Sequence, residues 1–279
     1  MRPSKGNTPA HQKGNVVMKK LFALVMVLVM TLTCFAACNT NAGASTDMEN
    51  IQQKGKIVIG ITDYAPMDYK DENGNWTGFD AEFAQLFAKE LGVTCEFYVI
   101  TDWSKKFMEL ETNQIDAVWN GMTITDEALL NASVSDPYVV NAQVVVMKAD
   151  KLADYPDAES MKNLSFAVEN GSAGQKAAEN VIGATNIVPV QDQGAALMEV
   201  AAGTSDACVV DITCANAMTG EGTSYADLGY SVSLTSEEYG VAFRKNSDLT
   251  EKLNAFMDKL IADGTLQKLA EKYEQTLVD

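Results

Sequence analysis

Histidine and arginine are nearly missing from this sequence of 279 residues. The one histidine is His11, and beyond residue 37 the one arginine is Arg244. Without an imidazole, the body of the chain cannot build a Ser-His-Asp or Cys-His nucleophile, a histidine metal ligand or a histidine general base. These common kinds of catalytic site are therefore excluded.

Positive charge as a whole is scarce. The chain has 21 lysines and arginines against 38 aspartates and glutamates, a net charge of −17. Residues 1–37 hold five of the cations and no acid, so the remainder has 16 basic and 38 acidic residues and a net charge of −22. Such a surface repels phosphate backbones, and we expect no nucleic-acid partner. The remaining ~242 residues can bury one large core or two smaller ones.

Cysteine is sparse beyond the first segment. Cys95, Cys208 and Cys214 are an odd number without metal-ligand spacing, so we expect neither a metal site nor a cofactor. Cys95 lies in an apolar, strand-like run, which favours a packed over a reactive thiol. Whether Cys208 pairs with Cys214 stays open.

The first segment has the parts of a secretory signal. A basic Lys19-Lys20 precedes an apolar run at residues 21–33, and small residues follow. The run is shorter than the ~20 apolar residues of a transmembrane helix. We expect residues 1–37 to be a leader, with Met18 as a possible true start.

The end of this leader resembles a bacterial lipobox. In Phe35-Ala36-Ala37-Cys38, the resemblance implies that Cys38 is diacylated, by palmitate or a similar chain, and becomes the mature N-terminus. Residues 38–53 would then be a flexible tether, and the protein would be anchored at the outer face of the bacterial cell membrane. The alternative is an ordinary signal peptide with an incidental cysteine.

The body alternates strand-like and helix-like stretches, which predicts an α/β fold. The first half predicts strands at 56–62, 93–100 and 115–120 and helices at 80–91 and 104–112. The second half predicts strands at 164–168, 187–190 and 206–210 and helices at 175–181 and 194–202. Met108-Glu109 and Asp116-Ala117 recur ninety positions later as Met198-Glu199 and Asp206-Ala207. This internal echo suggests two similarly built lobes.

Two apolar stretches, 138–148 and 239–244, flank the second repeat. They predict a chain that leaves the first lobe and returns to it, with helices capped by Ser247 and started at Thr265 completing that lobe. We therefore expect lobe 1 at 54–140 and 239–279, lobe 2 at 141–238, and a hinge of paired strands between them.

Five motifs carry a family resemblance. They are Asp71-Glu72-Asn73-Gly74 with Gly78-Phe79-Asp80, residues 115–125, Ser135-Asp136-Pro137-Tyr138, Asn170-Gly171-Ser172, and residues 262–265. In this order they resemble the amino-acid-type extracellular solute-binding proteins of ABC importers, over about residues 54–273. The resemblance implies a two-lobed type II periplasmic-binding-protein fold. It also implies capture of a small polar solute such as an amino acid, delivery to a membrane permease as a monomer, and no enzyme activity.

The candidate binding residues follow the ends of predicted strands. Asn120, Gly121 and Thr123 come after a buried strand, where α/β sheets bind ligands, although pattern alone allows a simple turn. Ser172 and Ala173 lie between a strand and a helix, which favours an anion seat and is equally compatible with a helix cap.

The remaining site residues are implied by the resemblance. It gives Asp211 the ligand's α-ammonium group, and it makes Tyr64 and Trp103 the walls around the ligand side chain. Pattern alone would make Asp211 a helix cap and the two rings ordinary core aromatics. Asp80 is expected to be an N-cap, because this explains the motif Gly78-Phe79-Asp80.

The sequence departs from the family at one position. Most relatives have a carboxylate-binding arginine where this chain has Ala128, and Arg244 lies on a strand expected to be structural. The ligand's carboxylate could rest on N–H groups of Ser172 and Ala173 with a charge from Lys105 or Lys106, or the ligand could lack one.

Two alternative functions stay open. The first is a carboxylate-dependent lyase or dehydratase on the same scaffold, with Asp211 and either Glu169 or Glu238 as acid and base. The second is a sensor lipoprotein with a ligand other than an amino acid.

Overall fold

The computed structural model describes residues 46–279 together with Met1, and this part of the chain contains two five-stranded sheets. Lys19, Lys20, Cys38 and the apolar run 21–33 lie outside the described residues. In spatial order, the first sheet contains β4 (Thr94–Val99), β1 (Lys56–Ile61), β5 (Ala117–Val118), β14 (Ala242–Phe243) and β6 (Ser133–Val134). The second contains β10 (Asn186–Val190), β9 (Ser165–Glu169), β11 (Ala207–Asp211), β8 (Gln143–Lys148) and β12 (Leu228–Ser233).

Both sheets are mixed in the same way. In the first, β1 is parallel to β4 and β5, and β14 is antiparallel to β5 and β6. In the second, β9 is parallel to β10 and β11, and β8 is antiparallel to β11 and β12. The two lobes suggested by the internal echo are thus built on one plan.

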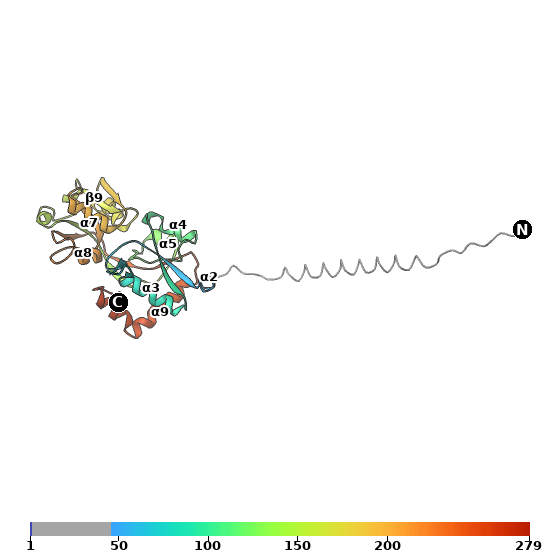
Figure 1. Cartoon of the computed structure of the whole chain (residues 1–279). Coiled ribbons are helices and arrows are strands. Elements are labelled where there is room, and N and C mark those ends of the chain that lie inside the picture. Colours follow the sequence, from blue (N-terminus) through green and yellow to red (C-terminus); the bar gives the residue numbers. More distant parts are fainter. Residues whose placement is uncertain (2–45) are drawn as a thin grey trace. The chain divides into compact units, whose positions relative to one another are not determined.

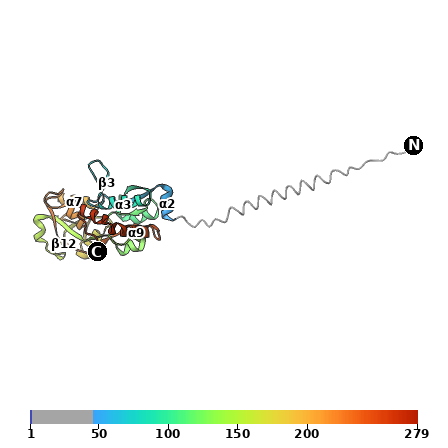
Figure 2. The same cartoon turned by 90° about the horizontal axis from the view of Figure 1, so that it is seen from below.

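Helices cover each sheet and define its lobe. The first lobe has α2 (Asp47–Lys54), α3 (Phe79–Glu90), η1 (Trp103–Lys105), α4 (Lys106–Glu111), α5 (Asp126–Asn131), α9 (Leu249–Ala262) and α10 (Thr265–Lys272). The second has η2 (Ala149–Asp154), η3 (Glu159–Met161), α6 (Ala173–Ala177), a π-helical turn (Ala178–Ile182), α7 (Gln193–Ala202) and α8 (Ile212–Met218). Figure 1 shows α3, α4, α5 and α9 in one half of the body and α7, α8 and β9 in the other, and Figure 2 shows the same division from below. None of the described helices is long and apolar enough to cross a membrane.

The chain crosses between the lobes on a pair of short strands. β7 (Val139–Asn141) leaves the first lobe and β13 (Glu237–Tyr239) returns to it, and the two pair antiparallel. The paired-strand hinge expected from the sequence is therefore present. A small hairpin of β2 (Tyr69–Lys70) and β3 (Trp76–Thr77) completes the first lobe.

The core of the first lobe is aromatic. Phe83 lies edge-on against Trp119 with ring centroids 4.9 Å apart, and Phe87 packs on Phe256 at 5.7 Å. These fully or largely buried rings join α3 and α9 to the sheet. The core of the second lobe is mostly aliphatic, with the buried ring of Phe166 and β-branched residues such as Val145 and Val209 on its central strands.

The expectation that Asp80 caps a helix is wrong. Helix α3 begins at Phe79 after Gly78, and the Asp80 side chain caps no backbone N–H of that helix. Instead the buried carboxylate accepts hydrogen bonds from the Gly121 N–H at 2.5 Å and the Tyr138 hydroxyl at 2.8 Å. The Phe79 N–H donates to the Pro66 carbonyl and the Asp80 N–H to the Met67 carbonyl, and both side chains are buried.

Several element boundaries also differ from those expected. The strand expected at 115–120 is reduced to β5, and the helix expected at 175–181 changes to a π-helical turn after Ala177. Helix α9 has Asp248 rather than Ser247 at its N-cap, although the Ser247 hydroxyl accepts from the Leu249 N–H at 3.3 Å. The open question of pairing is answered too: Cys208 and Cys214 are both free and buried.

Candidate functional site

One pocket between the lobes gathers all eight predicted ligand-binding residues. Five come from the first lobe and three from the second: Tyr64, Trp103, Asn120, Gly121, Thr123, Ser172, Ala173 and Asp211. The pocket encloses a cavity of about 40 Å³. A contact of these residues with a ligand stays a prediction, but their convergence from distant points of the sequence is a property of the fold.

Tyr64 forms one wall of the pocket. Its hydroxyl lies 2.7 Å from the Tyr239 hydroxyl and also bonds to Thr213 of the second lobe, and burial raises the pKa of this phenol. The ring packs on the backbone of Gly121, where φ is +54° and a Cβ atom would lie 2.6 Å from Tyr64 Cε1. Glycine is therefore required at 121 for the ring to lie there.

Asn120 and Thr123 are engaged by the protein itself. The Asn120 amide donates to the Thr62 carbonyl at 3.1 Å and to Asp68 at 2.8 Å, and its oxygen accepts from the Thr62 N–H and hydroxyl. Thr123 donates its hydroxyl proton to Glu237 at 3.0 Å. Asn120 thus fixes the turn that presents Gly121, and Thr123 connects this turn to the hinge strand β13.

Asp211 lies at the end of β11 and is held by three amides. Its Oδ1 accepts from Asn141 Nδ2 at 2.5 Å and Gln143 Nε2 at 2.6 Å, and its Oδ2 accepts from Gln193 Nε2. Burial, followed by the nearby Glu237 carboxylate, raises the pKa of Asp211 to about 6, against the effect of these hydrogen bonds. Although Asp211 occupies the N-cap position of α8, its side chain caps nothing.

A second carboxylate, Glu169, faces the same pocket from the end of β9. Its side chain is 4% exposed, and its Oε1 has no hydrogen-bond partner among the described residues. Burial, with the charge of Asp211 adding to it and Lys106 opposing it, raises the pKa of Glu169 to about 8. The sequence offered Glu169 only as an acid–base candidate, but its place at a strand end beside Gly171-Ser172 marks it as a pocket residue.

Lys106 lies in the pocket, whereas Lys105 does not. Lys106 is 6% exposed, and its Nζ lies 3.3 Å from the Gly171 carbonyl oxygen and 5.0 Å from the Trp103 ring centroid. Burial lowers the pKa of Lys106 to about 8. Lys105 turns away to pair with Asp102 at 3.1 Å. Ala128, on α5, lines the pocket without offering a charge.

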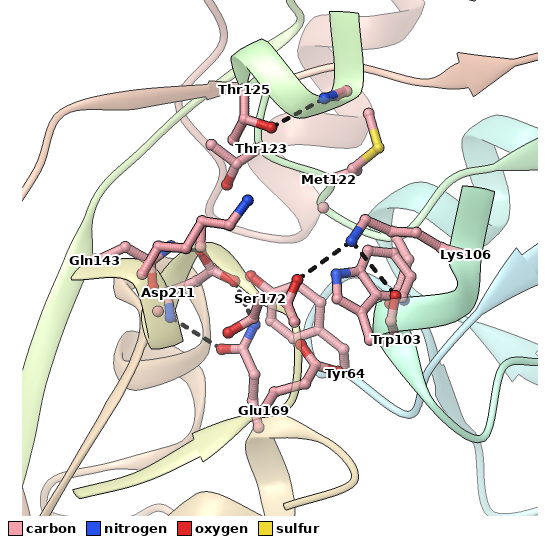
Figure 3. A pocket seen from close by; sticks show the side chains of 18 of the residues that line it. Tyr64, Trp103, Lys106, Met122, Thr123, Thr125, Gln143, Glu169, Ser172 and Asp211 are labelled. Carbon is pink, nitrogen blue, oxygen red and sulfur yellow. Dashed lines mark hydrogen bonds between the residues drawn. The ribbon is translucent and has the colours of Figure 1, made fainter. Parts of the chain in front are cut away.

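Ser172 caps the short helix α6, with its Oγ accepting from the Gln175 N–H at 3.1 Å. Gly171 precedes it with φ +75°, and a Cβ atom there would lie 2.6 Å from the Cα atom of Ser104. Glycine at 171 therefore permits the two lobes to approach closely beside Ser172 and Ala173. Figure 3 shows Ser172 between Asp211 and Lys106 in this view.

The side chains that line this pocket are suited to bind a polar, charged ligand. Its lining combines two aromatic walls, two buried carboxylates of raised pKa and one buried ammonium. Within residues 46–279 no group of three or more histidine, cysteine or acidic side chains is arranged to hold a metal ion. The arrangement can hold a small molecule that carries charges of both signs.

Comparison with known proteins gives consistent matches. The family model "Bacterial extracellular solute-binding proteins, family 3" matches residues 57–276. The L-cystine-binding protein TcyJ of Escherichia coli K12 is 27% identical over 88% of this chain and 92% of its own. The arginine-binding extracellular protein ArtP of Bacillus subtilis is 28% identical over 92% of this chain and 98% of its own.

Solved structures of other proteins have the same fold as this chain. A mutant of ArgBP from T. maritima has a TM-score of 0.75 and 32% identity, covering 81% of this chain and 98% of its own. The ancestral amino acid-binding protein AncCDT-1, a precursor of cyclohexadienyl dehydratase, has a TM-score of 0.74 and 33% identity over 81% and 98%. The two-lobed type II fold expected from the sequence is confirmed.

Proposed function

The chain belongs to the bacterial extracellular solute-binding proteins of family 3, and we propose that it captures an amino acid or a close derivative for an ABC importer. The observation that carries this proposal is Asp211, a buried carboxylate held by three amides in the lining of a pocket between two lobes. Such a site has its hydrogen bonds in place before a cationic group arrives, and it gains a counter-charge when an α-ammonium binds.

The relatives support this class of ligand. Several of them are named for the binding of arginine, and others for cystine, histidine or glutamine. These ligands share an α-ammonium and an α-carboxylate and differ in their side chains. We infer that Tyr64 and Trp103 flank the side chain, with Gly121, Thr123, Ser172 and Ala173 around the charged end.

Hinge closure supplies the mechanism. In the structure the lobes touch around the pocket, through Tyr64 with Thr213, Asn170 with Asp102 at 3.1 Å, and Lys176 with Glu127. Because both lobes line the pocket and touch around it, they would have to separate for a solute to enter. The solute would therefore enter an open form and favour closure through its stronger binding to the closed form.

The lobes proposed are residues 54–140 with 239–279, and residues 141–238. The location of the hinge strands β7 and β13 at these junctions supports this division. Relative movement of the lobes would then need backbone rotation at only a few hinge residues.

We further propose that the protein is a monomeric lipoprotein at the outer face of the cell membrane. The support is the basic and apolar segment 19–33 followed by Phe35-Ala36-Ala37-Cys38. The tether expected at residues 38–53 is too long, because α2 (Asp47–Lys54) belongs to the first lobe, with Ile51 buried in its core and Asp47 paired with Arg244. Cleavage before Cys38 and acylation of its thiol would leave the residues from Cys38 to the start of α2 as the tether.

A lyase or dehydratase is the second candidate. The observation in its favour is a pair of pocket carboxylates whose pKa values differ, about 8 for Glu169 and about 6 for Asp211. At neutral pH the first would be a proton donor and the second a proton acceptor. The similar protein AncCDT-1, described as an amino acid-binding precursor of a dehydratase, makes this candidate worth testing.

Native mass spectrometry separates these functions. The full chain carrying Cys38→Ala is purified, and its co-purified small molecules and its affinity for L-arginine, L-histidine, L-glutamine and L-cystine are measured. Binding of one amino acid without conversion supports the receptor. Conversion of the bound molecule supports the enzyme. No amino acid bound below about 1 mM contradicts the proposal and favours a sensor with another ligand.

A further inference from the structure

The pocket has one buried cation that the protein leaves unpaired. Its lining contains two lysines, Lys106 and Lys176. Lys176 pairs with Glu127 at the rim and has a half-exposed side chain. Lys106 is 6% exposed and takes part in none of the ion pairs formed within residues 46–279.

The existing contacts of Lys106 do not satisfy an ammonium group. Its Nζ has three N–H donors, and its oxygen partners are two backbone carbonyls, of Gly171 at 3.3 Å and Trp103 at 3.4 Å. The rings of Trp103 and Phe107 lie below it, each 5.0 Å from Nζ. A buried charge without an ion-pair partner is costly, and burial lowers the pKa of Lys106 to about 8, although the Glu127 and Glu169 carboxylates act against this shift without pairing to it.

The one arginine among the described residues, Arg244, does not line this pocket. Arg244 is held outside the pocket by Asp47 at 2.8 Å and Asp116 at 3.0 Å. Ala128, which also lines the pocket, has no charge to offer. Lys106 is therefore the buried cation that the pocket offers to an anionic end of a ligand.

We propose that Lys106 receives the carboxylate of the bound amino acid and is the residue that makes this pocket specific for a zwitterion. The inference rests on the proposed receptor function. Lys106 belongs to α4 of the first lobe, whereas the Gly171 carbonyl beside its Nζ belongs to the second. A carboxylate at this point would contact the first lobe through Lys106 and could accept the hydroxyl proton of Ser172 from the second.

The position of Asp211 completes the ligand's charge pattern. Asp211 and Lys106 lie on opposite sides of Ser172 and Tyr64 in Figure 3. An α-amino acid carries its ammonium and carboxylate on the same carbon; in this proposal the ammonium contacts Asp211, the carboxylate contacts Lys106, and the side chain extends between the rings. A ligand that lacks the carboxylate leaves Lys106 buried and unpaired, which costs affinity.

A pair of matched lysine variants tests this inference. Calorimetry at pH 7 compares the wild type with Lys106→Met, which keeps an unbranched side chain without the charge, and with Lys105→Met. Lys105 is the control because it is adjacent in sequence, exposed and outside the pocket. The probes are L-arginine, L-histidine, L-glutamine and L-cystine, and L-argininamide, L-histidinamide, L-glutamine amide and cystine diamide as the matched compounds without a free carboxylate.

We expect Lys106→Met to lose about 30-fold or more in affinity for the amino acid that the wild type binds. Lys105→Met should stay within about threefold, and the carboxamide should bind Lys106→Met at least as tightly as the wild type, because the variant has no unpaired ammonium to bury. Thermal unfolding verifies that each variant is folded, and Lys106→Arg, which keeps the charge, should retain most of the affinity.

Two results have separate meanings. A wild type that binds none of the four amino acids contradicts the proposed function itself. A wild type that binds one of them, with a folded Lys106→Met variant of equal affinity or an equal loss for the carboxamide, overturns the role of Lys106 and leaves the receptor function standing.

Discussion

Replacing Asp211 by asparagine is the most direct test of the site. The change keeps the shape of the side chain and removes its charge. Asp211 now accepts three side-chain N–H bonds, from Asn141, Gln143 and Gln193. An asparagine has one oxygen and one NH₂ group, so its nitrogen must face at least one of these donors, and at least one hydrogen bond is lost.

Two effects on folding stability oppose each other. The lost hydrogen bond to a charged group costs roughly 1.5–3 kcal/mol. However, the pKa of Asp211 rises from 3.8 to about 6 on folding, so its ionised form at pH 7 already destabilises the folded protein by on the order of 3 kcal/mol. Because asparagine avoids this cost, we expect the free energy of unfolding to stay unchanged or to rise by up to about 1.5 kcal/mol.

Ligand binding should respond much more strongly. Without the carboxylate, the ligand's ammonium is buried without a counter-charge, which costs about 2–5 kcal/mol, or roughly 30- to 4000-fold in affinity, mainly through faster dissociation. Calorimetry with the ligand identified by mass spectrometry measures this loss, and urea unfolding measures stability. Glu237→Gln is the matched control, since Glu237 shares the Asn141 and Gln143 donors but lies outside the pocket lining.

Undiminished affinity in Asp211→Asn would contradict a contact between Asp211 and the ligand's ammonium. An anionic ligand without any cationic group would contradict it equally. A loss of the same size in Glu237→Gln would show that the hinge network as a whole, rather than a direct contact with Asp211, determines affinity.

The remaining predictions concern the anchor, the aromatic wall, the missing arginine and a buried acid. Cys38→Ala should move the protein from the membrane fraction to the soluble fraction, because each buried methylene of an acyl chain contributes ~0.8 kcal/mol; unchanged retention contradicts the lipid anchor. Trp103→Ala should weaken binding by about 30-fold or more. Trp76 lies outside the pocket, so Trp76→Ala should leave affinity unchanged. If calorimetry gives Trp103→Ala the affinity of the wild type, Trp103 does not contact the ligand. Ala128→Arg should be tolerated or improve the binding of an amino acid through a bidentate pair, and a sharp loss in a folded variant would mean that the ligand has no carboxylate there. Burial raises the pKa of Asp68 well above its usual value, so wild-type stability should fall as pH rises above about 4, the range in which the acid ionises in the unfolded chain first. In urea unfolding at pH 5 and pH 8, Asp68→Asn should lose less stability between the two pH values than the wild type. Equal losses in the two proteins would refute this role of Asp68.

Much of the fold could be predicted from local pattern. Strand and helix order, the two lobes and the paired hinge strands follow from hydrophobic periodicity and the internal echo, and boundaries differ by a few residues. The role of Asp80 could not be predicted from the sequence, because an acid at the start of a helix has the same local pattern whether it caps that helix or turns inward. Its actual partners, Gly121 and Tyr138, lie 41 and 58 residues away along the chain.

The pocket, too, could be predicted only in part from the sequence. All eight predicted residues line the pocket because each follows a strand end or begins a helix at the sheet edge where ligands bind. Lys106 was only one of two neighbouring candidates, since sequence alone does not reveal which of two adjacent lysines on a short helical turn faces inward. Contact with Trp103 and Gly171 distinguishes it from Lys105, and that distinction requires the second lobe to be in place.

The hinge and the ligand site share one set of hydrogen bonds. Asn141 on β7 and Gln143 on β8 each donate both to Asp211 and to Glu237 on β13. Glu237 is the second-largest cause, after burial, of the raised pKa of Asp211, so the two carboxylates repel each other across these amides. A ligand ammonium at Asp211 would offset that repulsion at the point where both hinge strands pass. Binding would therefore stabilise the closed hinge through the same residues that recognise the ligand.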